Sequence, residues 1–180
     1  MAKTILLLRH AKSAWGHAAL ADHDRPLNRR GERAAEAMAD HIVRHTPRPD
    51  MILCSTATRT RQTLAPLVLR LAAPAPPIAL EKSLYLASED ALLARLQAVP
   101  DHVGTVLMIG HNDGIWRLAE TLAGHGRAPL LAALREKFPT GTLAALDATI
   151  ERWRDLAAGS GELVAFVRPR DLAARQPAPR

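Results

Sequence analysis

The sequence has little of what several protein classes require. Cys54 is the single cysteine, which excludes an intrachain disulfide framework and favours a reducing compartment. No apolar run approaches the ~20 residues that a membrane helix needs. The amino-terminal apolar run, residues 5–8, is followed at once by Arg9 and is too short for a signal peptide. We therefore expect a cytoplasmic protein without a membrane partner.

Aromatic residues make up only 3% of the chain, so platforms for stacking on nucleic-acid bases are scarce. The formal net charge is +6, and the basic residues are scattered along the sequence. A basic balance without a motif is weak support for nucleic-acid binding, whereas an anionic small substrate or a phosphoprotein would benefit equally from the positive field. We expect no nucleic-acid partner. A nucleic-acid-binding module stays as an alternative, and its affinity would fall steeply with salt.

The chain is long enough to bury a sizeable core. Its 180 residues are 48% apolar and 23% charged, which is ordinary for a globular protein and suits one domain. We place that domain at residues 1–172 and expect a frayed carboxyl-terminal tail over residues 173–180, where Pro and Arg residues gather.

Short apolar runs alternate with amphipathic segments along the chain. The apolar runs predict strands over residues 5–8, 51–54, 78–80, 103–109, 142–148 and 163–167. The amphipathic segments predict helices over residues 29–44, 64–71, 89–99, 115–123 and 130–137. Strands that alternate with helices indicate a three-layer α/β/α sandwich with a central, mostly parallel sheet.

Polar residues and glycines mark the ends of these helices. Asn28, Ser88 and Asn112 each stand directly before an expected helix and can serve as its N-cap. Gly124 and Gly126 are expected to close the helix over residues 115–123.

Two features suggest other chemistry but have simpler explanations. His41 and His45 are four residues apart on an expected helix, yet no further metal ligand accompanies them. A cysteine phosphatase would need five residues between its cysteine and arginine, and neither Arg59 nor Arg61 stands at that spacing from Cys54. We expect no metal site, and we expect Cys54 to be a small buried residue at a strand end.

Three of the expected strands end in residues suited to phosphate chemistry. The first ends in Arg9 and His10, the second runs into a loop with Arg59, and the fourth ends in Gly110 and His111. Parallel strands bring their carboxyl ends to one edge of a sheet, which is where open α/β sheets bind ligands. Histidine can act as a nucleophile, and guanidinium groups match phosphate oxygens. The sequence predicts a phosphoryl-handling site at this edge.

The same stretches resemble the histidine phosphatase (phosphoglycerate mutase-like) superfamily. The segment Arg9-His10-Ala11 looks like its RHG/RHA signature, residues 55–63 are similar to its second motif, S-P-x-x-R-A-x-Q-T, and Gly110-His111-Asn112 resembles its third. Residues 24–31 and 84–88 look like the compact branch of bacterial phosphohistidine phosphatases. Three motifs in the right order form a specific signal.

The resemblance implies a catalytic and substrate-binding role for Arg9, His10, Arg59 and His111. His10 would be phosphorylated during turnover, and the two arginines and His111, cationic in the complex, would hold the phosphoryl group. Water would then hydrolyse phospho-His10. No metal and no other cofactor is expected, since the arginines take the role that metals serve elsewhere.

The resemblance leaves the general acid open. Larger relatives carry it in a W-E-G-type element, where this chain has Leu84-Tyr85-Leu86. Glu81, Glu89 and Asp90 are the candidates, although the last two also suit the first turn of a helix.

The missing acid favours phosphohistidine on a protein as the substrate, because its imidazole can leave once solvent protonates it. One alternative is a phosphatase of small phosphomonoesters from the same superfamily. Another is a non-catalytic module that binds phosphate or phosphoproteins. The sequence leaves the oligomeric state open.

Overall fold

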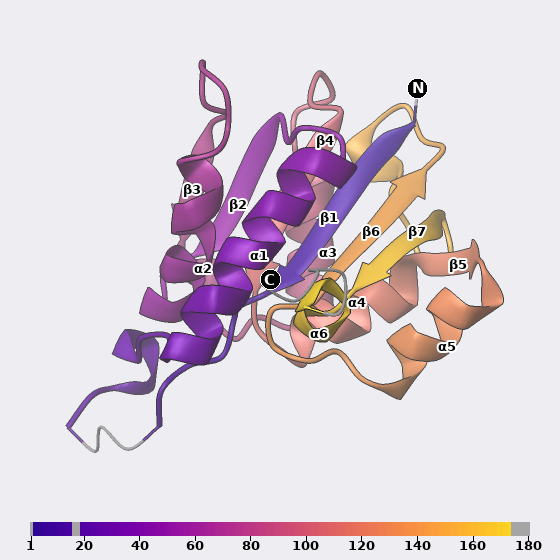
Figure 1. The fold of residues 1–180 in the computed structure, drawn as a ribbon. Helices are drawn as coiled ribbons and strands as arrows, with labels where there is room; N and C mark the ends of the chain where they lie inside the picture. The colour runs from indigo at the N-terminus through magenta and orange to yellow at the C-terminus, as the bar shows by residue number, and fades with distance from the viewer. Residues whose placement is uncertain (1, 16–18, 174–180) are drawn as a thin grey trace.

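A seven-stranded sheet runs through the centre of the molecule, with helices in front of it and behind it (Figure 1). The computed structural model describes residues 2–15 and 19–173, so the expected tail lies outside the described residues from position 174 onward. The strand order is β3-β2-β4-β1-β6-β7-β5. The strands are β1 (Lys3–Arg9), β2 (Met51–Ser55), β3 (Ile78–Glu81), β4 (Thr105–Gly110), β5 (Ala123–Gly126), β6 (Leu143–Ala148) and β7 (Gly161–Val167).

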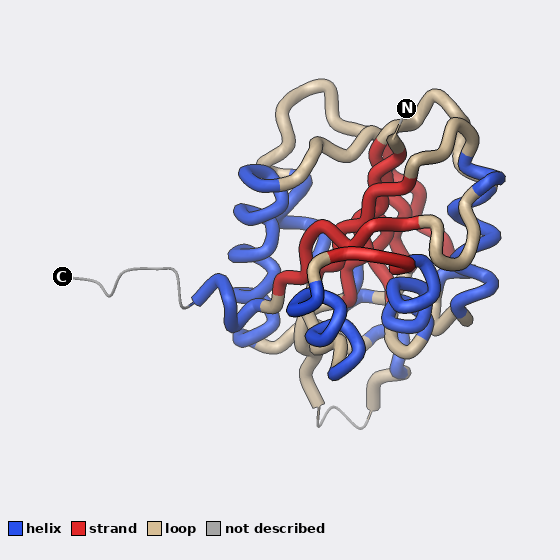
Figure 2. Tube along the Cα trace, turned by 90° about the vertical axis from the view of Figure 1, so that its right-hand side faces the viewer, coloured by secondary structure: helices blue, strands red, loops and turns tan. Residues whose placement is uncertain are grey.

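Helices form the two outer layers, as the edge-on view of the sheet shows (Figure 2). The α-helices are α1 (Arg29–His45), α2 (Thr58–Val68), α3 (Glu89–Gln97), α4 (Gly114–Leu122), α5 (Ala128–Glu136) and α6 (Pro169–Ala173). Short 3-10 helices are η1 (Asp22–Asp24), η2 (Lys82–Leu84) and η3 (Trp153–Asp155). In the described part of the chain, no helix combines the length and apolar character that a membrane crossing requires.

The pairing of the strands confirms the expected fold class. β3, β2, β4 and β1 are parallel neighbours, and β5 is parallel to β7. β6 alone runs against its neighbours β1 and β7. The carboxyl ends of β1, β2 and β4 therefore meet at one edge of the sheet, as the sequence predicts.

Two separate cores explain why the strands are continuous apolar runs. Ile5 and Leu7 of β1 face the core under α3, α4 and α5, whereas Leu6 and Leu8 face the core under α1 and α2. All four side chains are almost fully buried. A parallel strand covered on both faces has no solvent side and needs apolar residues at every position.

Two of the three predicted N-caps are confirmed. Asn28 Oδ1 accepts a hydrogen bond from Gly31 N at 2.8 Å, and Ser88 Oγ accepts one from Ala91 N at 3.3 Å. The prediction for Asn112 is wrong, because α4 begins after Asp113. Asn112 Nδ2 instead donates to the carbonyl of Phe138 at 3.1 Å.

Two predicted element boundaries are also wrong. α2 begins at Thr58, well before the expected residue 64, so Arg59 lies in the first helical turn and not in a loop. Gly124 and Gly126 lie in the short strand β5, which pairs with β7. A Cβ at Gly124 would lie 2.0 Å from the carbonyl oxygen of Gly159. Glycine is therefore needed there for close packing against the neighbouring chain segment.

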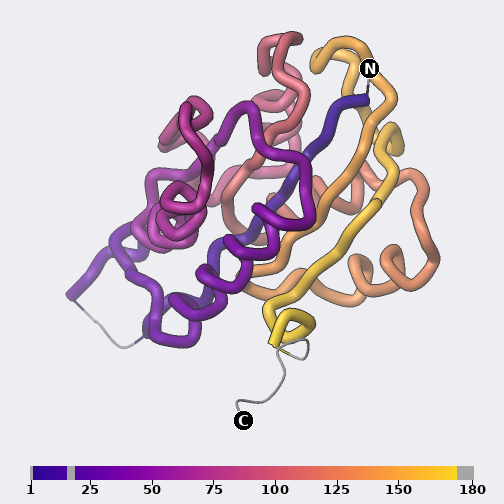
Figure 3. The backbone as a smooth tube through the Cα atoms, turned by 45° about the horizontal axis from the view of Figure 1, so that its top comes forward, coloured from indigo at the N-terminus to yellow at the C-terminus, as the bar shows by residue number. Residues whose placement is uncertain are grey.

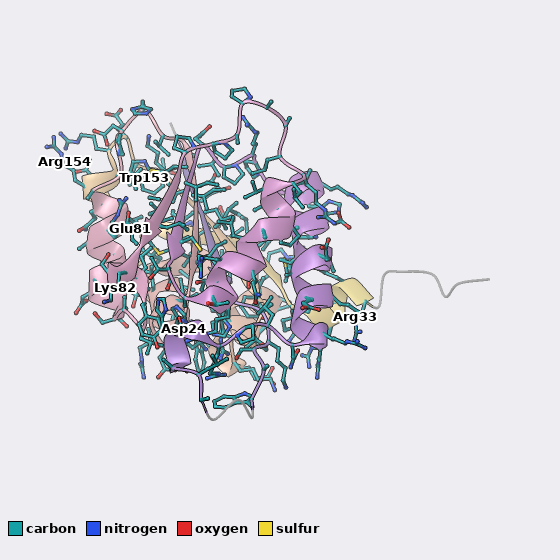
Figure 4. The ribbon with its side chains drawn as sticks, turned by 90° about the vertical axis from the view of Figure 1, so that its left-hand side faces the viewer. Asp24, Arg33, Glu81, Lys82, Trp153 and Arg154 are labelled. Carbon is teal, nitrogen blue, oxygen red and sulfur yellow. The ribbon has the colours of Figure 1, made fainter. Side chains whose placement is uncertain are left out.

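η1 and η3 lie at opposite ends of the molecule. Figure 4 shows Trp153 of η3 near one end of the molecule and Asp24 of η1 near the other. β7 leads into α6, which packs against α1 (Figure 3). α6 therefore lies on the same side of the molecule as the amino-terminal part of α1.

The chain segment after β1 is held by an unusually close approach to α1. Asn28 N donates to the carbonyl oxygen of Lys12 at 3.0 Å. One turn later, a Cβ at Gly31 would lie 2.1 Å from the same oxygen and 2.9 Å from Lys12 N. Only glycine leaves room for this contact, which fixes the backbone two residues beyond His10.

We expect Gly31→Ala to destabilise the fold by about 2 kcal/mol, because the new methyl group must push backbone atoms apart. The measurement is the free energy of unfolding in urea. The matched control is Arg33→Ala, since Arg33 lies on the outer side of the same helix (Figure 4), where a surface change usually costs less than about 0.5 kcal/mol. Equal stabilities of the two variants would contradict the steric argument.

Candidate active site

The parallel pairing of β1 with β4 brings two predicted histidines together. Arg9 and Gly110 are register partners, and His10 N donates to the carbonyl of Gly110 at 3.1 Å. The rings of His10 and His111 then lie with their centroids 5.3 Å apart. The sheet register thus places the two imidazoles side by side at the carboxyl edge.

His10 is buried, and its ring is held in one tautomer. Its Nδ1 lies 2.7 Å from the carbonyl oxygen of Ala11. A carbonyl oxygen can only accept, so Nδ1 carries the proton and Nε2 keeps its lone pair. Burial, and then the nearby charge of Arg59 and Arg9, lowers the pKa of His10 to about 4. At neutral pH the ring is an uncharged base with a free Nε2.

Thr63 of α2 ties the backbone next to His10 to the second motif. Its hydroxyl accepts a hydrogen bond from Ala11 N at 2.9 Å and donates one to the carbonyl of Arg59 at 2.7 Å. One buried hydroxyl therefore links the histidine loop to the turn that carries Arg59.

Arg59 lies almost fully buried at the start of α2, with 3% of the residue exposed. Its Nη2 donates to Asp22 Oδ2 at 2.9 Å and lies 3.3 Å from His111 Nδ1. Its Nη1 donates to the carbonyl of Asp22 at 2.5 Å. The guanidinium is thus pinned between η1 and the end of β4.

His111 is also neutral in this structure. Because Arg59 can only donate, His111 Nδ1 accepts, and Nε2 donates to Ser55 Oγ at 2.8 Å. Burial, and then the proximity of His10 and Arg59, lowers the pKa of His111 to about 3. A cationic His111 would therefore require the negative charge of a bound anion.

Arg9 completes the predicted set at the end of β1. Its Nη1 donates to the carbonyl of Phe138 at 2.7 Å, and burial lowers its pKa. A cavity of about 260 Å³ opens here and is lined by Arg9, His10 and Arg59, together with Lys12, Ser13, Trp15, Arg25 and Thr140. We call it the catalytic cavity. His111 is not part of this lining. Its ring contacts two residues that are, His10 and Arg59.

Sequence reasoning missed the role of Asp22 and Tyr85. Asp22 Oδ2 accepts from the Tyr85 hydroxyl at 2.5 Å, and Oδ1 accepts from Arg25 Nη1 at 2.6 Å. The hydrogen bond from Tyr85, followed by those from Arg59 and Arg25, lowers the pKa of Asp22 to about 2. The signal in the sequence was the charged string over residues 22–25, which overlaps the segment 24–31 that resembles the compact branch.

The three predicted candidates for the acid do not line the catalytic cavity. Glu81 forms a two-pronged ion pair with Arg95, with N···O distances of 2.7 to 2.9 Å. Glu89 accepts a hydrogen bond from the Thr121 hydroxyl at 3.2 Å. Asp90 lies in the first turn of α3, as its alternative explanation predicted. Figure 4 shows Glu81 well separated from Asp24 of η1.

The simpler explanation for the cysteine is confirmed. Cys54 is fully buried, and burial raises the pKa of its thiol to about 12, so it supplies no thiolate. The rings of His41 and His45 lie with their centroids 4.8 Å apart and their planes tilted by 41°. Across residues 2–15 and 19–173, no group of three or more His, Cys, Asp or Glu side chains is placed to hold a metal ion.

Comparison with known proteins agrees with this geometry. A family model described as the histidine phosphatase superfamily (branch 1) matches residues 5–84. An uncharacterized protein of Mycobacterium tuberculosis is 39% identical over 165 residues, which cover 91% of this chain and 100% of that protein.

Two solved structures of similar sequence share the fold. A candidate phosphohistidine phosphatase SixA from Nakamurella multipartitia superposes with a TM-score of 0.81 at 35% identity, covering 94% of this chain and 97% of that one. A candidate phosphohistidine phosphatase SixA from Agrobacterium tumefaciens gives 0.78 at 34% identity, covering 93% and 98%.

The depressed pKa of His10 predicts acid destabilisation with a defined sign. The folded pKa of about 4 lies below the ordinary value of 6.5, so the unfolded chain binds the extra proton first as pH falls. The free energy of unfolding should decline as pH is lowered from 6.5 towards 4. Urea denaturation across this range should show a smaller decline for His10→Ala than for the wild type.

Ring NMR of the folded protein provides the direct check. The His10 signals, assigned by their loss in His10→Ala, should keep the neutral form at pH values where the urea-unfolded chain is already protonated. Protonation of folded His10 near its ordinary pKa would contradict the burial argument.

Proposed function

The chain belongs to the histidine phosphatase superfamily, in its SixA-like branch, and is a phosphatase. From this premise we propose that it hydrolyses phosphohistidine on proteins through a covalent phospho-His10 intermediate, with Arg9, Arg59 and His111 holding the phosphoryl group. The neighbours from Nakamurella multipartitia and Agrobacterium tumefaciens carry phosphohistidine phosphatase names, and this supports the choice of substrate.

The observation that carries the proposal is the state of His10. Its Nδ1 proton is committed to the Ala11 carbonyl, so Nε2 is free to attack phosphorus. In the first step a bond forms between Nε2 and phosphorus while the bond from phosphorus to the substrate imidazole breaks. The departing imidazole takes up a proton from solvent. In the second step water attacks phospho-His10, inorganic phosphate leaves, and Nε2 recovers its lone pair.

The guanidinium groups of half-buried Arg9 and buried Arg59 take the part that metal ions have in other phosphatases. Arg9 and Arg59 line the catalytic cavity together with His10, and charge spreads over the phosphoryl oxygens as the transition state forms. His111 can join them as a cation once a bound anion opposes the burial that now lowers its pKa. The proposed reaction therefore uses no metal.

The carboxylates around the site favour a phosphoramidate over an alkyl ester. An alkoxide leaving group needs a proton donor, and Asp22, whose pKa is about 2, is ionised at neutral pH. An imidazole leaving group makes no such demand once solvent has protonated it. Phosphohistidine therefore fits the site better than a phosphomonoester.

The contact of the Asp22 carboxylate with Arg59 is the observation that would favour a small-molecule phosphomonoesterase. A bound phosphate dianion would raise the pKa of a carboxylate beside it. An Asp22 protonated in this way could donate to an ester oxygen. In that case Asp22→Asn should lower kcat on esters by roughly 10²-fold or more.

The first test measures phosphate release from a phosphohistidine protein and from a panel of phosphomonoesters. His10→Ala should lose at least about 10³-fold in kcat on phosphohistidine, because the nucleophile is gone. Added chelator should leave the wild-type rate unchanged. The control is His102→Ala, since residue 102 precedes β4 and lies at the opposite edge of the sheet.

Three measurements separate the candidate functions: phosphate release, phosphate binding and nucleic-acid binding. Strong ester turnover with weak turnover of phosphohistidine would favour the phosphomonoesterase. Phosphate binding without His10-dependent release from either substrate would favour a non-catalytic binding module. Steep salt dependence of binding to mixed RNA or DNA would favour the nucleic-acid alternative.

A second prediction concerns the ion pair between Asp22 and Arg59. We expect Asp22→Asn to bind inorganic phosphate about tenfold more tightly, or ~1.4 kcal/mol, because a carboxylate no longer competes for the guanidinium. Isothermal titration with phosphate measures this. Asp24→Asn is the matched control, since Asp24 lies two residues away and contacts His23 instead. Weaker phosphate binding by Asp22→Asn would contradict the competition.

A further inference from the structure

A second and larger cavity adjoins the catalytic cavity. Its volume is about 450 Å³, and it shares Arg9, Lys12 and Thr140 with the catalytic cavity. The two cavities therefore meet along one wall. A ligand whose phosphoryl group lies beside His10 would have to pass Arg9, Lys12 or Thr140 to reach the second cavity.

The walls of this second cavity are strongly basic. No Asp or Glu lines it, and its six cationic residues are Arg9, Lys12, Arg30, Lys137, Arg168 and Arg170. We call it the basic pocket. Positive charge gathered in one concavity focuses the electrostatic field and attracts anions.

Several of these cations are not neutralised by neighbouring carboxylates. Arg168 is paired with Asp171 at 3.0 Å, and Arg170 approaches the same carboxylate at 3.9 Å. Within the described residues, Lys12, Arg30 and Lys137 form no ion pair. The pocket therefore keeps an excess of positive charge that is available to bind an anionic ligand.

The cations come from distant parts of the sequence. Lys12 follows β1, Arg30 lies in the first turn of α1, Lys137 follows α5, and Arg168 and Arg170 flank the start of α6. The packing of α6 against α1 (Figure 3) brings the carboxyl-terminal arginines to the amino-terminal ones. Gathering like charges in this way costs stability, which a bound anion would recover.

The basic pocket also has a rigid apolar side. Trp116 of α4 lines it, and its indole Nε1 donates to the carbonyl of Leu134 at 2.8 Å. The buried ring of Phe138 contributes to the same lining. A ligand could therefore lay an apolar linker along this side while its charged end meets the cations.

We propose that the basic pocket is a subsite for a second anionic group, a carboxylate or phosphate carried on the same molecule as the phosphoryl group that His10 attacks. This inference rests on the proposed phosphatase function and narrows its substrate class. The pocket itself has no histidine, cysteine or carboxylate in its lining, so it offers neither a nucleophile nor a proton-transfer group. Its role is binding and selection.

The test uses non-hydrolysable alkyl phosphonates, so that binding is measured apart from turnover. Each phosphonate carries either a terminal carboxylate or the matching carboxamide, and the alkyl chain runs from two to eight carbons. The readout is the ratio of the two Kd values at each length. In the wild type we expect the carboxylate to bind about tenfold more tightly at the best length.

The variant Arg30→Gln/Lys137→Gln should bring this ratio close to one. The ratio cancels any change in folding or in the catalytic cavity, because both phosphonates share the phosphonate group. Arg33→Gln is the matched control, since Arg33 lies on the same helix but outside the lining of the basic pocket, and it should keep the wild-type ratio. A ratio near one at every length, or an unchanged ratio in the double variant, would overturn the proposal.

A peptide arm identifies where the second anion comes from. Phosphohistidine-analogue peptides with Asp or Asn at neighbouring positions are compared in the same way. A preference confined to Asp peptides assigns the second anion to an acidic side chain of a protein substrate. A preference already present with short carboxylates assigns it to a small molecule.

Failure of this proposal is separable from failure of the proposed function. Selective binding of carboxylate phosphonates by a protein without His10-dependent turnover would support the subsite and refute the phosphatase mechanism. Normal His10-dependent turnover, with carboxylate and carboxamide phosphonates bound equally well, would support the phosphatase mechanism and refute the subsite.

Discussion

The site depends on the parallel, in-register pairing of β1 with β4. Arg9 lies opposite Gly110, and the backbone of His10 is hydrogen-bonded to the same glycine. A shift of one residue would turn the side chains of β1 to the opposite face of the sheet and separate His10 from His111. The two apolar cores prevent such a shift, because every residue from Ile5 to Leu8 is buried on one face or the other. Core packing thus sets the position of the reactive groups.

Burial then decides their chemical state. The same packing that fixes the strand ends removes water from both histidines, and their pKa values fall to about 4 and about 3. A neutral His10 is a nucleophile, whereas a protonated one would not be. Arg59 stays buried because Asp22 and His111 satisfy its donors. Position and reactivity therefore have one origin in the closely packed edge of the sheet.

Much of this could be predicted from the sequence, because local patterns carry it. Continuous apolar runs ending in Arg9-His10 and Gly110-His111 predicted the strands and the edge at which they meet. What failed depends on contacts between distant segments. Gly124 and Gly126 were interpreted as the end of a helix, because glycine is common there. The strand β5 was missed, because its pairing with β7 depends on residues far along the chain. Asp22 was missed for the same reason, because its partners Arg59 and Tyr85 are 37 and 63 residues away.

The ion pair between Asp22 and Arg59 has a further consequence for the end of the catalytic cycle. The Asp22 carboxylate holds the Arg59 guanidinium at 2.9 Å, and Arg59 is the residue proposed to hold the phosphoryl group. Asp22 thus competes with phosphate for Arg59. Because it belongs to the same chain, its local concentration is fixed and does not depend on the concentration of phosphate in solution. In the proposed reaction, the return of Asp22 to Arg59 would speed the departure of inorganic phosphate and reduce inhibition by this product. A substrate that makes further contacts outside the catalytic cavity would displace Asp22 more readily than free phosphate, which has none to add.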